Sequence, residues 1–567
     1  MNDTIRLCRC DLALSPDLAP ALAALGGLAH APRWLARSLA VAPALVDARI
    51  NLAARLGPAA AQAMLRPALA LKPDEPSAWF NLGVARARSA QAAAAYRRSL
   101  ALAPAADAAA NLADVLRDGD PLIAAIPFYR RALALAPAHP VLIESLAFTL
   151  HYDPRAASEE IFRLNRRWGA LLARPRALPA RPGALQQRFP APASAKPGAP
   201  RSRLRVGYLS ADLHDHPVGR NLVGLIEHHD PGAVEVFLYA GRAGEDRIVR
   251  RLKAAAAAWR MTQDLDDDAL AERLRADRLD LLVFLAGHTP DNRLSLATHR
   301  TAPLQLAMHD LTTSGLGEID AVLGDEATMP EGGEERFVER ILRLPSFYLH
   351  EALPQVAVAP RAPGAEAPLL LVCANNPAKL NDRVIDLWME ILRRLPEARL
   401  LLKYRDRFGD PLIQARWRDR AGALAGRLVF HAGDEDLEAH LAVIGAADIA
   451  LDPFPFNGAT TTYEALWMGV PVITLKGRRF VGRACASMLE TIGLAELAAS
   501  DEADYLAKVL ALAAQPQRRA ALRATLRARL EASPLLDAAA YARAVEAQYR
   551  RLWEEQGDRE RTKSSPR

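Results

Sequence analysis

Three consecutive threonines, residues 460–462, follow an Asn457-Gly458 turn and precede Glu464 by about one helical turn. The surrounding segment, 448–472, has the pattern of a strand, a loop, a helix and a further strand. N–H groups at a helix start and neighbouring hydroxyls bind phosphate well, and a carboxylate one turn along can accept hydrogen bonds from ribose hydroxyls. A simple helix cap is the alternative, but three threonines between a glycine and a carboxylate favour a nucleotide site.

Acidic and sulfur-bearing side chains show no convincing metal-site pattern. The clusters 264–268 and 434–436 contain Asp-x-Asp spacings, but neither follows a strand in the right context, and both are typical of solvated loops or helix starts. We therefore expect no metal and no other cofactor. The cysteines include no pair with zinc spacing, and so few in a long chain indicate a reducing compartment. They are Cys8, Cys10, Cys373 and Cys485.

A scaffold that gathers the loops after several strands would have to position these side chains. After Leu204, short β-rich runs alternate with amphipathic helical stretches in two series, separated near residues 354–368. This alternation predicts an α/β protein with two Rossmann-like halves, whose ligands lie beyond the carboxyl ends of parallel strands. A last helix is predicted over 537–553. The predicted strands are 204–209, 234–240, 279–285, 304–308, 321–323, 369–374, 399–403, 428–431, 448–452 and 470–475.

A phrase of the type Arg-Ser-Leu-Ala-Leu-Ala-Pro recurs in the first quarter of the chain, ending at Pro43, Pro73, Pro104 and Pro137. The spacings of 30, 31 and 33 residues approach the period of a tetratricopeptide (TPR) repeat, in which proline ends the second helix. We predict an all-α, TPR-like superhelical domain, whose concave face could hold an extended polypeptide. The proline- and arginine-rich stretch 174–203 is predicted to be a linker.

Length and charge exclude several classes of protein. A chain of 567 residues is too long for one core and should divide into three or four domains. The formal charge is +6, and no basic stripe with interleaved aromatic residues appears, so nucleic acid is not an expected partner. No apolar run reaches membrane-spanning length, and the N-terminus lacks a secretory signal pattern. We expect no membrane span and a cytoplasmic location.

The region 204–553 resembles the catalytic region of the O-GlcNAc transferase-like glycosyltransferases. The matching phrases are Phe-Asn-Gly-Ala-Thr-Thr-Thr-Tyr-Glu-Ala-Leu-Trp-Met-Gly-Val-Pro at 456–471, Asp-Ile-Ala-Leu-Asp at 448–452 and Arg-Ala-Cys-Ala-Ser at 483–487. A TPR arm in front of this region is also the family's layout. The resemblance implies the two-Rossmann-domain fold called GT-B, and transfer of N-acetylglucosamine from UDP-GlcNAc to protein serine or threonine.

In the second half, the resemblance implies residues that bind the donor. Lys379 matches a family lysine that contacts the diphosphate, where an ammonium group would stabilise the UDP leaving group. His440, eight residues before Asp448, matches a histidine that contacts uridine. The other donor-binding residues predicted here are Asn376, Gly458, Thr460, Thr461 and Glu464.

In the first half, the resemblance implies residues near the acceptor. His216 lies in a His-Pro pair after the strand 204–209 and matches an active-site histidine, which could orient or deprotonate a hydroxyl. Glu272 aligns with a carboxylate proposed for the same role, although an exposed helix carboxylate is the favoured interpretation. His288, within a Gly-His-Thr loop, and Thr313 complete the predicted site.

One loop departs from the family pattern. The family carries Pro-Gly-Thr-Thr/Ser-Gly after the strand that corresponds to 304–308, whereas this chain has His-Asp-Leu-Thr-Thr-Ser-Gly at 309–315. The proline and glycine are absent, and the loop is one residue shorter. Because the family's loop borders the sugar and the acceptor, both identities stay open at this point.

We therefore predict an inverting, metal-independent enzyme that moves N-acetylglucosamine from UDP-GlcNAc to a protein held by the repeat arm. One alternative uses another UDP-sugar, such as UDP-glucose, and an asparagine, a glycan or a small molecule as acceptor. The other is a non-catalytic TPR scaffold that carries a nucleotide-binding module. The predicted parts are repeats 1–173, linker 174–203, a first Rossmann-like half 204–360, a second half 361–536, and a closing helix with a disordered tail 537–567.

Overall fold

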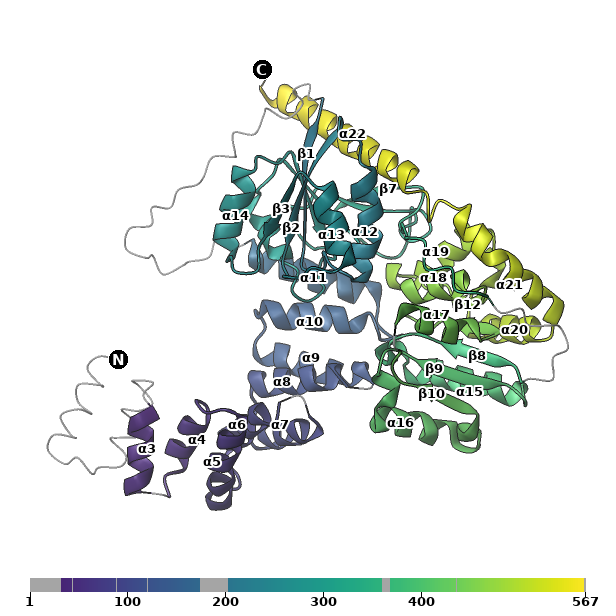
Figure 1. Ribbon diagram of the computed structural model, residues 1–567. Helices are drawn as coiled ribbons and strands as arrows, with labels where there is room; N and C mark the ends of the chain where they lie inside the picture. Colours follow the sequence, from purple (N-terminus) through teal and green to yellow (C-terminus); the bar gives the residue numbers. More distant parts are fainter. Residues whose placement is uncertain are drawn as a thin grey trace. The chain divides into compact units, whose positions relative to one another are not determined.

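The computed structural model describes residues 32–42, 44–87, 89–119, 121–173, 202–358, 368–434 and 436–564. The chain divides into two compact units, Met1–Thr149 and Leu150–Arg567, whose elements are labelled in Figure 1. The predicted linker lies outside the described residues, apart from Ser202 and Arg203. Cys8, Cys10 and Pro43 also lie outside them.

Among its described residues, the first unit contains helices and no strand, as the repeated phrase predicts. Successive helices pack on one another, and Gly83 allows the closest approach, because a Cβ there would lie 2.5 Å from the Tyr96 ring. Ser99 Oγ donates to the Pro76 carbonyl across the same helix pair, at 2.9 Å. These contacts fit a TPR-like arm. Its helices are α3 (Pro32–Val41), α4 (Val46–Ala53), α5 (Pro58–Leu71), α6 (Pro76–Ala85), α7 (Ala90–Leu102), α8 (Ala106–Arg117), α9 (Ile126–Leu135) and α10 (Pro140–Leu150), the last reaching the boundary.

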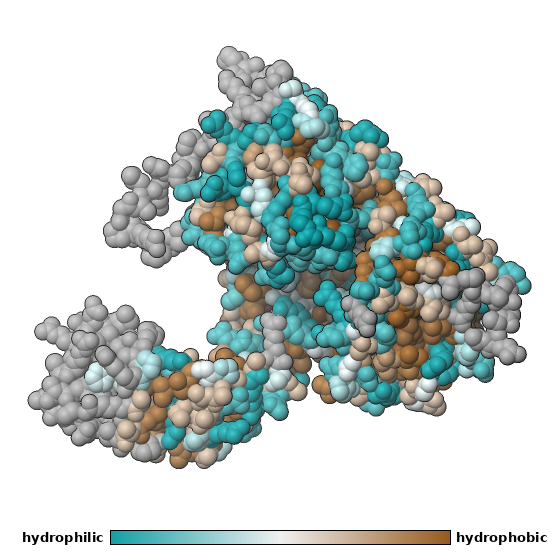
Figure 2. Space-filling view, in the orientation of Figure 1, coloured by the Kyte–Doolittle hydropathy of each residue, from teal (hydrophilic) through white to brown (hydrophobic). Residues whose placement is uncertain are grey.

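The second unit contains two parallel sheets among its described residues. The first has the order β3-β2-β1-β4-β5-β6-β7, a doubly wound arrangement that reverses direction between β1 and β4. Its strands are β1 (Leu204–Ser210), β2 (Val234–Ala240), β3 (Ala258–Met261), β4 (Leu281–Leu285), β5 (Leu304–Met308), β6 (Ala321–Gly324) and β7 (Arg340–Arg343). The helices between them are α12 (Pro217–His228), α13 (Arg247–Ala255) and α14 (Asp267–Ala276). Figure 2 shows a hydrophilic outer surface over α13, whose Ile248, Val249 and Leu252 are buried.

The second sheet repeats this topology with the order β10-β9-β8-β11-β12-β13. Its strands are β8 (Leu370–Cys373), β9 (Arg399–Lys403), β10 (Leu428–His431), β11 (Ile449–Leu451), β12 (Val472–Leu475) and β13 (Ala498–Ala499). Its helices are α15 (Asp382–Arg394), α16 (Pro411–Ala421), α17 (Leu437–Gly445), α18 (Thr460–Trp467), α19 (Ala484–Thr491), α20 (Glu502–Ala513) and α21 (Pro516–Glu531). The predicted pair of Rossmann-like halves is therefore confirmed.

Three strands were absent from the prediction, and each lies at or beside a sheet edge. No residue of β3 is fully buried, and β7 has one buried residue, Leu342. β7 also carries Arg340 and Arg343 at its two ends. β13 has only two residues. Edge strands lack the continuous apolar run of a central parallel strand, so their sequence signal is weak.

Two helices lie elsewhere than the predicted domain boundaries suggest. α11 (Ser158–Leu172) is part of the second unit, where Asn165 Nδ2 donates to the Thr313 carbonyl at 3.2 Å. α22 (Ala538–Ser564) is longer than the predicted 537–553 helix, and the segment predicted to be a disordered tail continues it to Ser564. Tyr541, Val545 and Tyr549 of α22 enter the core of the first half, so the C-terminal helix completes the N-terminal Rossmann-like domain.

Candidate functional site

Lys379 and the threonine helix lie together at the carboxyl edge of the second sheet. Lys379 follows β8 and ends a short 3-10 helix, η3 (Pro377–Lys379). Its Nζ donates to the Asn457 carbonyl at 2.6 Å and lies 4.3 Å from the centre of the Phe456 ring. Asn457 belongs to the turn before α18, so an ammonium group lies beside the start of that helix.

The start of α18 is built to accept an anion. Ala459, at the N-cap, gives no side-chain hydrogen bond, so the first-turn N–H groups keep their capacity to bind a ligand. Thr461 Oγ1 donates to Asn375 Oδ1 at 3.0 Å, and Thr460 and Thr461 are half-buried. A Cβ at Gly458 would lie 2.5 Å from Thr461 Oγ1, so only glycine fits this turn.

A buried carboxylate stands behind the lysine. Asp452 follows β11, is 1% exposed, and accepts from Gly458 N at 2.6 Å and Thr474 Oγ1 at 2.7 Å. Burial raises the pKa of Asp452 to about 7. Burial lowers the pKa of Lys379 to about 8, and the Asp452 charge opposes this change. A bound anion would favour the protonated lysine, so anion binding and lysine protonation support each other.

His440 and Glu464 form a second polar group at the same edge. His440 Nε2 lies 3.1 Å from Glu464 Oε2, and its Nδ1 lies 2.6 Å from Lys403 Nζ. An ammonium group can only donate, so Nδ1 can accept from Lys403, but Nδ1 also lies 3.2 Å from the Asp434 carboxylate, to which it donates only when it is protonated. The His440 ring is therefore held between the Lys403–Asp434 pair and Glu464, the carboxylate predicted to bind ribose.

Lys403 and Asp434 were not predicted as site residues. Lys403 ends β9, its side chain is fully buried, and its Nζ lies 2.7 Å from Asp434 Oδ2. The prediction of a solvated loop at 434–436 is wrong for Asp434, whose side chain is 10% exposed and also pairs with His431 at 2.9 Å. Burial works to raise the pKa of Asp434, but hydrogen bonds from Lys403 and His431 hold it below its usual range. A lysine at the end of a buried strand is the one sequence signal that could have indicated this network.

In the first half, His216 is the N-cap of α12. Its Nδ1 accepts from Val218 N at a long 3.4 Å and lies 3.7 Å from Asp212, and the side chain is 37% exposed. Burial lowers the pKa of His216, with Asp212 opposing and Arg405, after β9 of the second sheet, adding to the decrease. His216 is therefore a mostly neutral base at pH 7 that faces the other half.

The two weaker predictions in the first half have internal partners. His288 Nε2 lies 3.1 Å from the Ser314 carbonyl, and its ring meets the Trp168 ring edge-on at 4.7 Å. Thr313 is 1% exposed, and its hydroxyl donates to Glu339 at 2.6 Å. Thr313 therefore supports the loop from within and presents no hydroxyl at the surface.

Two further predicted residues have local roles. Asn376 is half-buried and caps η3 by accepting from Ala378 N at 3.0 Å, beside Lys379. Glu272 is exposed on α14, as its favoured interpretation predicts.

The loops after the strands of the two sheets contact each other. Ser487 Oγ of α19 donates to Asp325 after β6 at 3.0 Å, and Phe480 N donates to Glu335 at 2.5 Å. The carboxyl edges of both sheets therefore face one region, where ligands of doubly wound sheets are expected to bind.

Comparison with known proteins agrees with this geometry. The profile described as "Glycosyl transferase family 41" matches residues 186–353 and 365–545. The chain belongs to this family. An O-GlcNAc transferase of Thermobaculum terrenum, solved as a lysine-to-methionine mutant, is 30% identical with a TM-score of 0.75, over 91% of this chain and 99% of that one.

Curated relatives in plants belong to the same group. A probable UDP-N-acetylglucosamine–peptide N-acetylglucosaminyltransferase SPINDLY of Solanum lycopersicum is 30% identical, and the probable enzyme SEC of Arabidopsis thaliana is 26% identical. The first match covers 62% of this chain but 39% of the relative, so the chain spans about two fifths of that protein's length. Among the described residues, no helix is both long and apolar enough to cross a membrane.

The loop that departs from the pattern of family 41 has unusual geometry. His309 has a φ of 58°, in the left-handed region that a β-carbon disfavours. Within the described residues, neither ring nitrogen of His309 has a hydrogen-bond partner, and neither does either carboxylate oxygen of Asp310, which is 2% exposed. A Cβ at Gly287 would lie 1.5 Å from Asp310 Oδ1, so the loop packs directly on that glycine. Burial raises the pKa of Asp310 well above its usual value.

Proposed function

We propose that the protein transfers N-acetylglucosamine from UDP-GlcNAc to a serine or threonine hydroxyl of a protein, with inversion at the anomeric carbon. The observation that carries this proposal is the position of the Lys379 ammonium beside the uncapped start of α18. Membership of family 41 and the names of its relatives, which describe N-acetylglucosaminyl transfer, support the same reaction.

In this proposal the second half binds the donor. Lys379, Gly458, Thr460 and Thr461 hold the diphosphate, with Asn376 shaping the lysine loop. Glu464 accepts hydrogen bonds from ribose, and His440 contacts uracil. As the glycosidic bond breaks, negative charge grows on the departing UDP, where the ammonium and the helix N–H groups stabilise it. We assign this role to these groups without a metal ion or another cofactor.

The first half activates the acceptor. Nδ1 of His216 is turned toward Val218 N, so Nε2 is left to accept the hydroxyl proton. The acceptor oxygen forms a bond to the anomeric carbon, its proton passes to His216, and UDP leaves with the electron pair of the broken bond. The TPR-like arm is proposed to hold the acceptor polypeptide, and a cytoplasmic location stays a prediction.

Incubation of the purified chain with labelled UDP-GlcNAc and a cell lysate tests this function. We expect labelled polypeptide that loses its label after mild base treatment, because base eliminates sugars linked to serine or threonine. The Lys379→Ala variant should label little, and a chelator should not change the wild-type rate. Equal labelling by the variant would contradict the proposal.

Two alternatives have distinct outcomes in the same assay. The unpartnered polar groups of His309 and Asp310 favour a second candidate, in which another UDP-sugar is the donor. UDP release measured across a panel of UDP-sugars would identify that donor, and label that survives base would indicate an asparagine linkage. UDP binding without release from any sugar would instead support a non-catalytic scaffold.

A further inference from the structure

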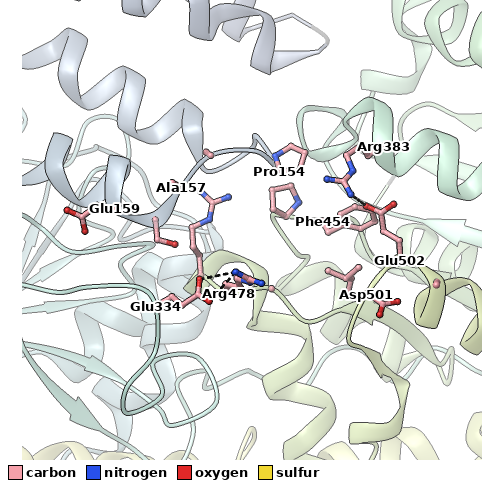
Figure 3. A pocket seen from close by; sticks show the side chains of 16 residues that line it. Pro154, Ala157, Glu159, Glu334, Arg383, Phe454, Arg478, Asp501 and Glu502 are labelled. Atoms are coloured by element: carbon pink, nitrogen blue, oxygen red, sulfur yellow. Dashed lines mark hydrogen bonds and ion pairs between the residues drawn. The ribbon is translucent and has the colours of Figure 1, made fainter.

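A pocket of about 870 Å³ lies at the carboxyl edge of the second sheet, outside the groups assigned to the donor (Figure 3). Loops after β11, β12 and β13 form most of its wall, and the first turn of α11 closes one side. Its volume lies within the usual range for binding sites. The pocket lies entirely within the second unit.

The pocket continues a line of sites along one sheet edge. The sheet order is β10-β9-β8-β11-β12-β13. The Lys403–His440 group follows β9 and β10, and the Lys379 group follows β8 and β11. The pocket comes next, and its Pro455 precedes Phe456, on which Lys379 lies. The proposed nucleoside, diphosphate and pocket therefore succeed one another along the edge.

The lining does not suit a carbohydrate. Carbohydrate sites commonly add an exposed aromatic ring, on which the sugar stacks, to their polar groups, and the aromatic ring in this lining, Phe454, is 3% exposed. Small residues line much of the surface instead, including Pro154, Ala157, Gly477 and Ala503. Such a surface leaves room for the side chains of a polypeptide.

Exposed ion pairs on opposite walls can exchange partners. Arg478 and Glu334 lie 3.2 Å apart with side chains 79% and 59% exposed, and Arg383 pairs with Glu502 on the other side of the pocket (Figure 3). Exposed ion pairs contribute little to stability, so charged side chains of a ligand can replace either partner at little cost. The pocket therefore suits a polypeptide that carries charged residues.

One wall is held in place before any ligand binds. The Arg479 side chain is buried and donates to the carbonyls of Leu150 and Asp153, at 3.2 and 3.3 Å. These bonds tie the loop after β12 to the segment that leads into α11. A wall already fixed loses little entropy when it binds a chain.

We propose that this pocket binds the acceptor polypeptide next to its reactive serine or threonine. The catalytic unit would then select acceptors by local sequence and charge, in addition to any selection by the helical arm. This inference rests on the proposed function, because it assigns the substrate of the same reaction.

The experiment uses the full chain, labelled UDP-GlcNAc and a degenerate peptide library with one fixed central serine. Ala157→Trp and Ala503→Trp each place a large ring at an exposed position of the pocket wall, and Ala254→Trp does so on the outer surface of α13 as a control. We expect the pocket variants to raise the KM for peptide about tenfold or more with UDP affinity changed less than about twofold. The control should behave as wild type.

A charge reversal sharpens the test. Arg478→Glu should shift the preference among flanking residues toward basic ones, whereas Arg250→Glu on α13 should not change it. Unchanged KM and unchanged preferences in all pocket variants would overturn the inference and leave the proposed function standing. A wild-type chain that neither consumes UDP-GlcNAc nor labels any polypeptide would reject the proposed function and this inference together.

Discussion

The two Rossmann-like halves share a topology but differ in how many hydrogen bonds their predicted site residues make. In the second half, Lys403, Asp434, His440 and Glu464 are linked by contacts of 2.6–3.2 Å. In the first half, His216 makes one long hydrogen bond of 3.4 Å, and the polar atoms of His309 and Asp310 have no partner within the described residues.

The donor-binding half therefore holds its polar side chains in fixed positions, whereas His216 in the other half is only loosely held. Groups that stabilise charge in a transition state work best when they are already oriented, because reorientation costs free energy during the reaction. The donor side meets this condition before any ligand binds. On the acceptor side, the His216 side chain is 37% exposed and loosely held, so it can reorient toward a substrate, and variants in the two halves should fail in different ways.

Lys379→Met should give the largest effect. Methionine keeps a side chain on Phe456 but removes the charge that stabilises UDP, so kcat should fall about a thousandfold. The pKa of Lys379 in the protein without ligand is about 8, so part of the Lys379 side chains are neutral between pH 8 and 9. UDP binding in this pH range should therefore take up a proton. Calorimetry in buffers of different ionisation enthalpy measures that uptake, which the variant should lack. Equal uptake in the variant would assign the proton to another group.

His216→Ala should lower kcat about a hundredfold, as expected for loss of a general base. Burial lowers the His216 pKa from 6.5, so the wild-type rate should rise with pH through a value below 6.5 and level off above it, where the imidazole is neutral. The variant should lose this acid limb and keep its UDP affinity. A pH profile of kcat decides between these outcomes, and a retained limb would show that another group accepts the proton.

Lys403→Met should weaken UDP binding about tenfold, because His440 loses one of the contacts that hold its ring in place. Loss of one partner from a buried ion pair also lowers the free energy of unfolding, by about 3 kcal/mol. The double variant Lys403→Met/Asp434→Asn serves as the control. It should recover stability in chemical denaturation without recovering affinity, and recovery of both would reduce Lys403 to a structural role.

Glu272→Gln should have the smallest effect, with kcat and KM within about twofold of wild type. The side chain is exposed on α14, and a neutral isostere changes little there. Steady-state kinetics with a fixed peptide would check this. A tenfold fall in kcat would move the proton acceptor from His216 to this carboxylate and end the simple contrast between the halves.

Local sequence patterns predicted much of this architecture. The bounds of β2, β5, β9 and β10 agree with prediction, because a buried parallel strand is a continuous apolar run whose ends are marked by polar residues. The threonine helix was placed correctly at Thr460 from its turn and hydroxyl pattern. Each of these features depends on residues close together in the chain.

Other features could not be read from neighbouring residues. Lys403 and His440 are 37 positions apart, and the packing of α17 on α18, next to the end of β9, brings them to Glu464. The packing of α22 on the first half links Tyr208 to Tyr549, 341 positions away. The local sequence around Tyr208 or Tyr549 carries no pattern that indicates the contact between them.

The sequence by itself determined the helical repeats, the two strand-and-helix series and the residue types that can bind a diphosphate. The tertiary structure alone decided which polar groups pair internally, as in Thr313 with Glu339, and which stay available, as in His216. The physical reason is that periodicity is set by contacts within a few residues, whereas pairing depends on strand order and crossovers that bring distant segments together.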